Sequence, residues 1–155
     1  MRHLNTILLL IALSTLSASA QRLRLGERMP DISVASEYGS KLEFIEQELA
    51  CLIFINSYCE PCIASLAEVD RTLLNTMEIV LLTTESSEDY NDIIERIGTT
   101  DFAIAYDIES KTHKSFGINY IPFAVIYSTK RKIVEWFGPV ELLNSLKREQ
   151  IAARL

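Results

Sequence analysis

Two cysteines three positions apart carry the chemistry that this sequence offers most plainly. Cys59 and Cys62 enclose Glu60 and Pro61, and the motif follows the apolar run 51–55. A buried strand that ends here, with a helix beginning at the motif, places both thiols at a helix N terminus. Unpaired N–H groups and the positive end of the helix dipole stabilise a thiolate there. Because the thiolate is the form that attacks disulfides, the pair predicts a redox-active Cys59–Cys62 disulfide that closes and reopens.

The two residues between the cysteines suit the first positions of that helix. The Glu60 carboxylate complements the dipole, and Pro61 lacks an N–H that would be unpaired there anyway. We expect Cys59 to attack a substrate disulfide and Cys62, one turn inward, to attack the Cys59 sulfur and release the reduced substrate. Glu60 also disfavours the Cys59 thiolate, since a nearby negative charge raises a thiol pKa. A less stabilised thiolate means a more reducing couple, so we predict a reductant.

The elements that position this pair alternate between strands and helices. Continuous apolar runs predict buried strands at 49–56 and 78–83, and apolar residues at helical spacing predict a helix from Pro61 to about Leu74. Further strands are predicted at 30–34, 41–44, 102–106, 123–127 and 132–137, with helices from Ser86 or Ser87 to Ile97, at 110–116 and from Pro139 to about Ala153. The acidic stretch 85–92 is expected on a solvated helix start. This order predicts an α/β fold, a central mixed sheet flanked by helices.

The first twenty residues have the pattern of a secretory signal peptide. A basic start precedes the apolar stretch 7–13 and the small residues Ala18-Ser19-Ala20. Cleavage after Ala20 is predicted to leave one domain, 21–155, in the periplasm or outside the cell. The apolar stretch is shorter than the ~20 residues that span a bilayer, so no stable membrane insertion is expected after cleavage.

Charge and the third cysteine limit the function classes further. The chain carries a net charge of −6, and because residues 1–20 hold one arginine and no acid, the remainder carries −7. An acidic domain without a basic stripe is a poor candidate for nucleic-acid binding. Cys51 lies in an apolar run and is expected to be a buried, inert core residue. In an oxidising compartment Cys59 and Cys62 would drift to the disulfide, so a reducing role needs an electron donor.

Four segments resemble the exported TlpA/ResA-like thiol–disulfide oxidoreductases, which have the thioredoxin fold. Residues 26–32 are similar to the G-x-x-x-P-x-F stretch that opens these domains, and residues 38–41 are similar to their D-G-K turn. The motif Cys59-Glu60-Pro61-Cys62 is identical to the C-E-P-C of ResA-like members. Ile121-Pro122, before the apolar run 123–127, occupies the place of the family's cis-proline.

The resemblance implies a fold and a site. It implies a thioredoxin-like domain with an added N-terminal β-hairpin, formed by 30–34 and 41–44, and a central helix–strand insertion between Cys62 and Pro122. It implies a cis Ile121–Pro122 bond against the two sulfurs, with the Ile121 backbone pairing an extended substrate. Tyr58, Glu60 and Pro61 would shape the site. The implied partners are a protein thiol or disulfide substrate and an upstream electron donor, with no cofactor and no metal; cytochrome c maturation is one family occupation.

Three positions depart from the family pattern. The family usually has tryptophan before the first cysteine, where this chain has Tyr58. The buried aspartate of thioredoxin corresponds to Ile53, and the glutamate three residues after the second cysteine of ResA-like members corresponds to Ser65. Those acids move protons on and off the second thiol. We therefore expect Glu60, a backbone carbonyl or water to serve instead, and exchange to be slow or strongly dependent on pH.

Three other functions remain open on the sequence. A structural disulfide in a non-enzymatic binding module needs no acid at all. A peroxidase with this fold needs threonine three residues before its reactive cysteine, and that position is Asn56. A copper chaperone would use soft thiolates, but such proteins separate their cysteines by three residues where this chain has two. His113, the candidate third ligand, is expected on a solvated helix surface.

Overall fold

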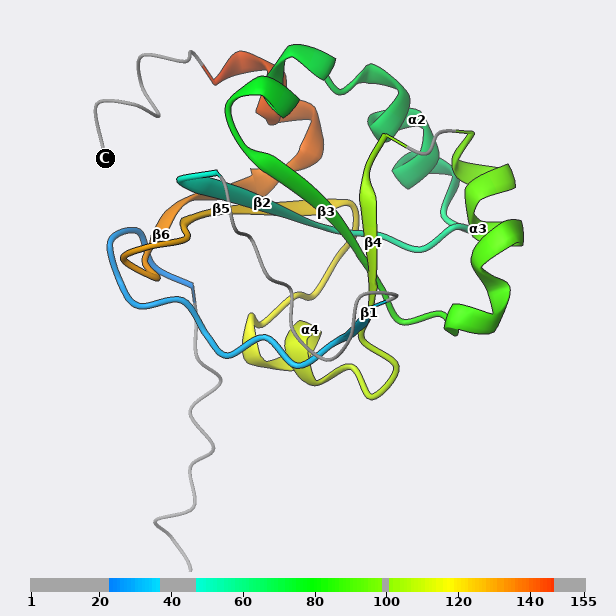
Figure 1. Ribbon diagram of the computed structural model, residues 1–155, viewed down its shortest axis with the longest axis horizontal. Helices are drawn as coiled ribbons and strands as arrows, with labels where there is room; N and C mark the ends of the chain where they lie inside the picture. Colours follow the sequence, from blue (N-terminus) through cyan, green and yellow to red (C-terminus); the bar gives the residue numbers. More distant parts are fainter. Residues whose placement is uncertain (1–22, 37–46, 99–100, 147–155) are drawn as a thin grey trace, which may run out of the picture.

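In the part of the chain that the structure describes, six strands form one mixed sheet in the order β1-β4-β3-β2-β5-β6 (Figure 1). The computed structural model describes residues 23–36, 47–98 and 101–146. The strands are β1 (Ala35–Ser36), β2 (Leu49–Phe54), β3 (Glu78–Thr83), β4 (Ala103–Tyr106), β5 (Phe123–Ser128) and β6 (Val134–Pro139). Strands β2, β3 and β4 run parallel, whereas β5 is antiparallel to β2 and β6, and β1 is antiparallel to β4. The carboxyl ends of β2, β3 and β4 therefore lie along the same end of the sheet.

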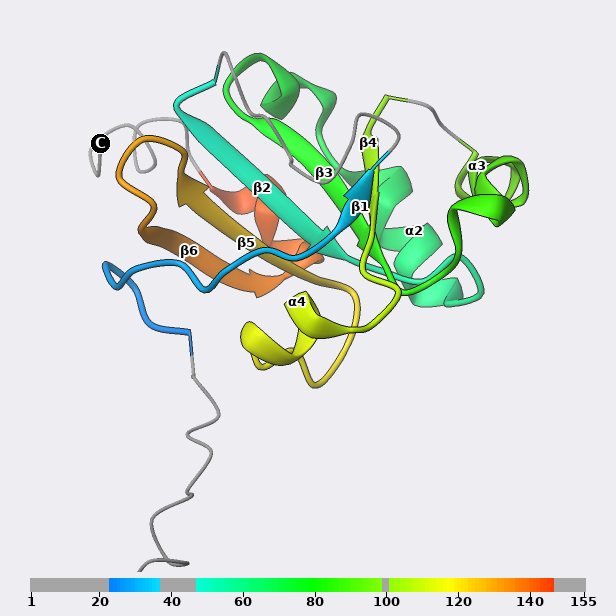
Figure 2. The same ribbon diagram turned by 60° about the horizontal axis from the view of Figure 1, so that its bottom comes forward.

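Helices cover both faces of this sheet (Figure 2). One face packs α2 (Glu60–Glu68), α3 (Tyr90–Ile97) and the 3₁₀ helices η1 (Arg71–Asn75) and η3 (Val140–Ser145). The other face packs α4 (Lys111–Ser115) and the N-terminal segment 23–34. A third 3₁₀ helix, η2 (Ser87–Asp89), leads into α3. Within β2, Cys51 and Ile53 belong to the first core cluster, and Leu52 and Phe54 to the second. This strand is buried from both sides, which explains its continuous apolar sequence.

The predicted buried strands are confirmed, because β2 and β3 lie within the runs at 49–56 and 78–83. The helix–strand insertion that the resemblance implied is also present. Helix α3 and strand β4 form an extra crossover between β3 and α4, and β4 pairs in parallel with β3. The predicted hairpin at 123–137 is confirmed as β5 and β6. Helix α3 ends where expected, at Gly98, whose positive φ of 72° suits glycine.

The helix predicted from Pro61 to Leu74 was wrong in its second half. Helix α2 ends at Glu68, where Val69 turns to an extended ψ of 124°. Asp70 then accepts a hydrogen bond from the Thr72 N–H at 2.9 Å and begins the 3₁₀ helix η1. An aspartate that bonds the backbone two residues on favours a new turn over a continuing α-helix.

The helix predicted from Pro139 to Ala153 was wrong where the structure describes it. Residues 140–145 form the 3₁₀ helix η3, and Leu146 closes it in an extended conformation. The expected apolar stripe is not continuous, because Leu143 is buried while Leu142 is exposed. Residues 147–155 lie outside the described part.

The strand predicted at 30–34 was wrong, because these residues form no strand; the two-residue β1 that follows pairs with β4 and lies at the edge of the sheet. The N-terminal hairpin is therefore not confirmed. The predicted second strand, 41–44, lies outside the described residues, as does the predicted signal peptide. In residues 23–36, 47–98 and 101–146, no helix is sufficiently long and apolar to cross a bilayer.

Candidate active site at the Cys59–Cys62 disulfide

Cys59 and Cys62 form a disulfide at the N terminus of α2, with their Cα atoms 5.2 Å apart. Cys59 is the N-cap residue of this helix, and its sulfur accepts a hydrogen bond from the Cys62 N–H at 3.3 Å. Glu60 begins the helix as predicted, and Pro61 follows within its first turn. Since the Cys59 sulfur stands in for a thiolate in the reduced protein, this N–H and the helix dipole would stabilise its charge.

The two sulfurs differ in their access to solvent. Cys62 is completely buried and belongs to the core under the sheet, whereas Cys59 is half-buried and packs at the edge of that core. This difference fits the predicted order of attack, with Cys59 outermost. Cys51 is fully buried in β2 as expected, and burial raises the pKa of its thiol far above the ordinary value. A thiol held neutral in this way does not compete in exchange.

The loop before Cys59 is held by an acid that sequence reasoning placed in solvent. Glu85, two residues beyond β3, accepts hydrogen bonds from the Ser57 N–H at 2.8 Å, the Ser57 hydroxyl at 2.6 Å and the Thr83 hydroxyl at 2.7 Å. Ser57 and Thr83 are both buried. The expectation that the whole stretch 85–92 is solvated was therefore wrong at its first residue, because Glu85 turns back to the loop.

Arg96 from α3 completes the surroundings of this loop. Its Nη1 lies 3.3 Å from the Ser57 hydroxyl oxygen, and its guanidinium carbon lies 4.1 Å from the centroid of the Tyr58 ring. Tyr58 is 72 % exposed, so the aromatic residue before Cys59 stands on the surface. A shallow depression of about 470 Å³ opens beside the disulfide, lined by Ser57, Tyr58, Glu60, Ile63, Ala64 and Arg96.

The Ile121–Pro122 bond is cis, as the resemblance implied. Phe123, the next residue, pairs with Phe54 at the end of β2. The cis bond and the loop that carries Cys59 therefore leave the sheet at the same edge. Ile121 is half-buried and packs against both core clusters.

The carboxylate of Glu141 reaches Ser65, the position on α2 where ResA-like members have a glutamate. The Ser65 hydroxyl, buried one turn after Cys62, donates a hydrogen bond to Glu141 Oε1 at 2.9 Å. Glu141 comes from η3, 76 residues further along the chain. Glu60, a backbone carbonyl or water was expected to serve in place of the family's acids, and Glu141 adds a carboxylate at Ser65 that was not predicted.

His113 is not the solvated surface residue that was expected. Its Nδ1 lies 2.7 Å from Oδ2 of the buried Asp107, and its ring meets Phe54 edge-on with the centroids 4.9 Å apart. Asp107 also accepts hydrogen bonds from the Thr112 and His113 N–H groups. Asp107 and His113 together fix the start of α4 beneath the sheet, so a structural role explains this histidine.

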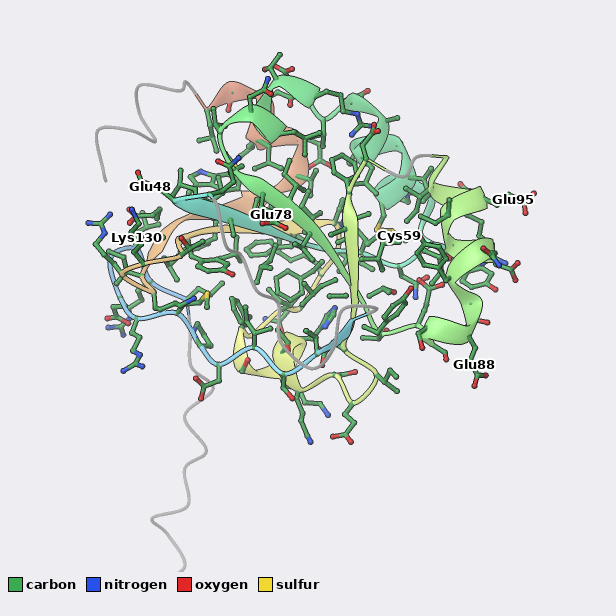
Figure 3. All side chains as sticks on the ribbon, viewed as in Figure 1. Glu48, Cys59, Glu78, Glu88, Glu95 and Lys130 are labelled. Carbon is green, nitrogen blue, oxygen red and sulfur yellow. A yellow bond between two sulfur atoms is a disulfide. The ribbon has the colours of Figure 1, made fainter. Side chains whose placement is uncertain are left out.

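The site lies at one end of the molecule. Figure 3 shows Cys59 on the side where α2 and α3 meet, with Lys130 and Glu48 at the opposite end. The exposed acids Glu88 and Glu95 point outward on the same side as Cys59. At the end opposite Cys59, Lys130 lies on the exposed turn between β5 and β6, and its Nζ lies 2.7 Å from Glu48 Oε1.

No protein-family model and no curated protein matches the chain. Several solved structures are nevertheless similar to it. A putative thiol:disulfide interchange protein DsbE from Chlorobium tepidum is 20 % identical, with a TM-score of 0.66 over 84 % of this chain and 97 % of that one. StoA from Bacillus subtilis is 19 % identical, with a TM-score of 0.57 over 77 % and 98 %. A thiol-disulfide oxidoreductase from Bacteroides fragilis is 18 % identical, with a TM-score of 0.59 over 83 % and 96 %. The expected thioredoxin-like fold is confirmed.

Proposed function

We propose that this thioredoxin-like domain is an exported thiol–disulfide oxidoreductase that reduces protein disulfides through Cys59 and Cys62. One observation carries the proposal: the Cys59 sulfur caps α2 from a half-buried position, while Cys62 lies buried one turn inward. The helix N terminus stabilises the outer thiolate, and the inner thiol is bonded to the Cys59 sulfur and buried from solvent. The names of the similar structures support the same reaction class.

The reaction transfers two electrons from the cysteine pair to a substrate cystine. The Cys59 thiolate attacks one substrate sulfur, the substrate S–S bond breaks, and the departing sulfur takes up a proton. Cys62 then loses its proton and attacks Cys59 Sγ, which displaces the second substrate thiolate and closes the Cys59–Cys62 disulfide. A dithiol donor restores the reduced pair by the reverse steps. No cofactor takes part.

The proton from Cys62 has one candidate acceptor among the carboxylates of the described residues. Glu141 accepts a hydrogen bond from the Ser65 hydroxyl, on the helix turn after Cys62. A carboxylate near a buried thiol assists its deprotonation when it can relay the proton to water. This contact supports exchange despite the apolar residue at Ile53.

The substrate would dock as an extended strand beside the cis peptide bond. Ile121 stands at the sheet edge that also carries the Cys59 loop, and its backbone is the group that the resemblance assigns to substrate pairing. Tyr58, Glu60 and Pro61 would border the entering chain. All three are exposed around Cys59.

Export is supported by the sequence of residues 1–20. Cleavage after Ala20 would release the domain 21–155 into the periplasm or the medium. Because such compartments favour the disulfide, the proposal includes an upstream dithiol that keeps the pair reduced.

Replacing Cys62 with alanine will trap the substrate. Cys59 can then form the mixed disulfide, but no second thiol resolves it, so the covalent complex accumulates. The measurement is the yield of complexes that dithiothreitol releases, separated on non-reducing gels from cells of the source organism. The matched control, Cys59→Ala, leaves the buried thiol and should trap nothing. Trapping by the Cys59→Ala protein instead would reverse the assigned roles.

A further inference from the structure

Glu85 lies beneath the loop that precedes Cys59 and accepts hydrogen bonds that the exchange reaction itself does not require. Glu85 accepts three hydrogen bonds on its two carboxylate oxygens, two from Ser57 and one from Thr83. The Glu85 N–H also lies 3.2 Å from the Thr83 hydroxyl, which fixes the turn after β3. Because hydrogen bonds to an ionised acceptor are about twice as strong as neutral ones, this group holds its partners firmly. We call these three bonds the Glu85 clamp.

The clamp acts on the residues that aim Cys59. Ser57 precedes Cys59 by two positions, and between them the Tyr58 N–H donates to the Asn56 side chain at 2.9 Å. The Cys59 N–H donates to the Asn56 carbonyl at 3.0 Å. These short bonds make the loop one tight turn, so holding Ser57 also sets where the Cys59 sulfur stands relative to α2.

Arg96 ties the other side of Ser57 to α3. The Ser57 hydroxyl donates to Glu85 and accepts from Arg96, whose guanidinium stacks on the Tyr58 ring. The loop is therefore fixed from β3 by a carboxylate and from α3 by a guanidinium. Neither residue belongs to the motif or touches a sulfur in any described contact.

We infer that Glu85 is a positioning residue for the Cys59–Cys62 pair, holding the Cys59 loop so that the disulfide closes readily and the couple stays reducing. The inference rests on the proposed function. Two effects of Glu85 act in the same direction. A fixed loop keeps the two sulfurs in register, which raises the effective concentration of one thiol near the other. The negative charge under the loop disfavours the Cys59 thiolate, which also stabilises the disulfide relative to the reduced pair.

The substitution Glu85→Gln tests this inference, because the amide keeps the shape but removes the charge and at least one acceptor. We expect the equilibrium constant for reduction by glutathione to shift about tenfold toward the dithiol, which is about 30 mV for a two-electron couple. Thiol quantification in glutathione buffers of graded ratio measures it. Glu88→Gln is the matched control, since Glu88 is an exposed acid three positions on that points into solvent (Figure 3). It should leave the constant within about twofold.

A second variant keeps the test decisive if Glu85→Gln does not fold. Ser57→Ala removes one donor of the clamp and keeps the charge and the backbone bond. It should shift the constant about threefold in the same direction. A Glu85→Gln protein whose melting temperature falls while its constant stays within twofold of wild type overturns the inference, since Glu85 would then be only structural. So does an unchanged constant in Ser57→Ala when Glu85→Gln is unfolded. A wild-type protein that never equilibrates with glutathione overturns the proposed function as well, which separates the two failures.

Discussion

Replacing Cys59 with serine will abolish thiol–disulfide exchange. A neutral hydroxyl replaces the thiolate at the N terminus of α2, so the rate of reduction of a cystine substrate should fall by at least about a thousandfold. The fold should persist, because Cys59 is half-buried and its capping contact to the Cys62 N–H is one that a serine oxygen also makes. Insulin reduction driven by dithiothreitol, followed by turbidity, measures the loss.

The control for this variant is Cys51→Ala. Cys51 is fully buried in β2 and its thiol pKa is raised by burial, so its removal should leave exchange intact within about threefold. Retained exchange in the Cys59→Ser protein would mean that the buried Cys62 attacks first. That outcome would contradict the assignment of the outer sulfur as nucleophile.

Replacing Leu52 with alanine will strongly destabilise the domain. Leu52 lies in the central strand β2, is 0 % exposed, and packs among the residues of the face that carries α4. Truncation of a buried leucine removes apolar contacts and leaves a cavity, which lowers the free energy of unfolding by about 2–5 kcal/mol. Urea unfolding of the oxidised protein, followed by circular dichroism, measures this change.

Leu142→Ala is the matched comparison. It removes the same atoms from a leucine in η3 whose side chain is 51 % exposed. Its free energy of unfolding should change by less than about 0.5 kcal/mol. An equal loss of unfolding free energy in the two variants would contradict the burial of Leu52 in the central strand β2.

The strands and the redox motif could be predicted because their signals are local. β2 and β3 are runs of apolar residues that no exposed strand would carry, and Cys59 and Cys62 are neighbours in the sequence itself. The helix boundaries were less predictable. Apolar spacing does not separate an α-helix from a 3₁₀ turn, and the end of α2 at Glu68 depends on the Asp70 side chain bonding its own backbone.

The acids of the site were missed because their contacts are distant in sequence. Glu85 meets Ser57 across 28 residues, and Glu141 meets Ser65 across 76. One signal for Glu85 was nevertheless present. Ser57 and Glu85 follow two predicted buried strands by one and two residues, and residues just beyond the carboxyl ends of neighbouring parallel strands meet at one end of the sheet. Glu141 offered no such signal, because the helix predicted for its segment was of the wrong kind.

His113 illustrates the same difficulty at shorter range. Its charged and polar neighbours in sequence are typical of a solvated helix, yet the burial of Asp107 turns the imidazole inward. A buried carboxylate needs hydrogen-bond donors, and the first turn of α4 with the His113 ring supplies them. The sequence pattern contains the donors and the acceptor but not the fact that they are buried together.

The most direct test of the account is a redox titration of the purified domain against glutathione and dithiothreitol buffers, with the Cys59–Cys62 state read by thiol alkylation and mass. For a reducing Cys59–Cys62 couple we expect a reversible two-electron transition with a midpoint near that of thioredoxin, about −270 mV. A midpoint near that of DsbA, about −120 mV, would contradict the reducing direction. A disulfide that no buffer opens in the native protein would contradict the reaction itself and leave the pair as a structural bond.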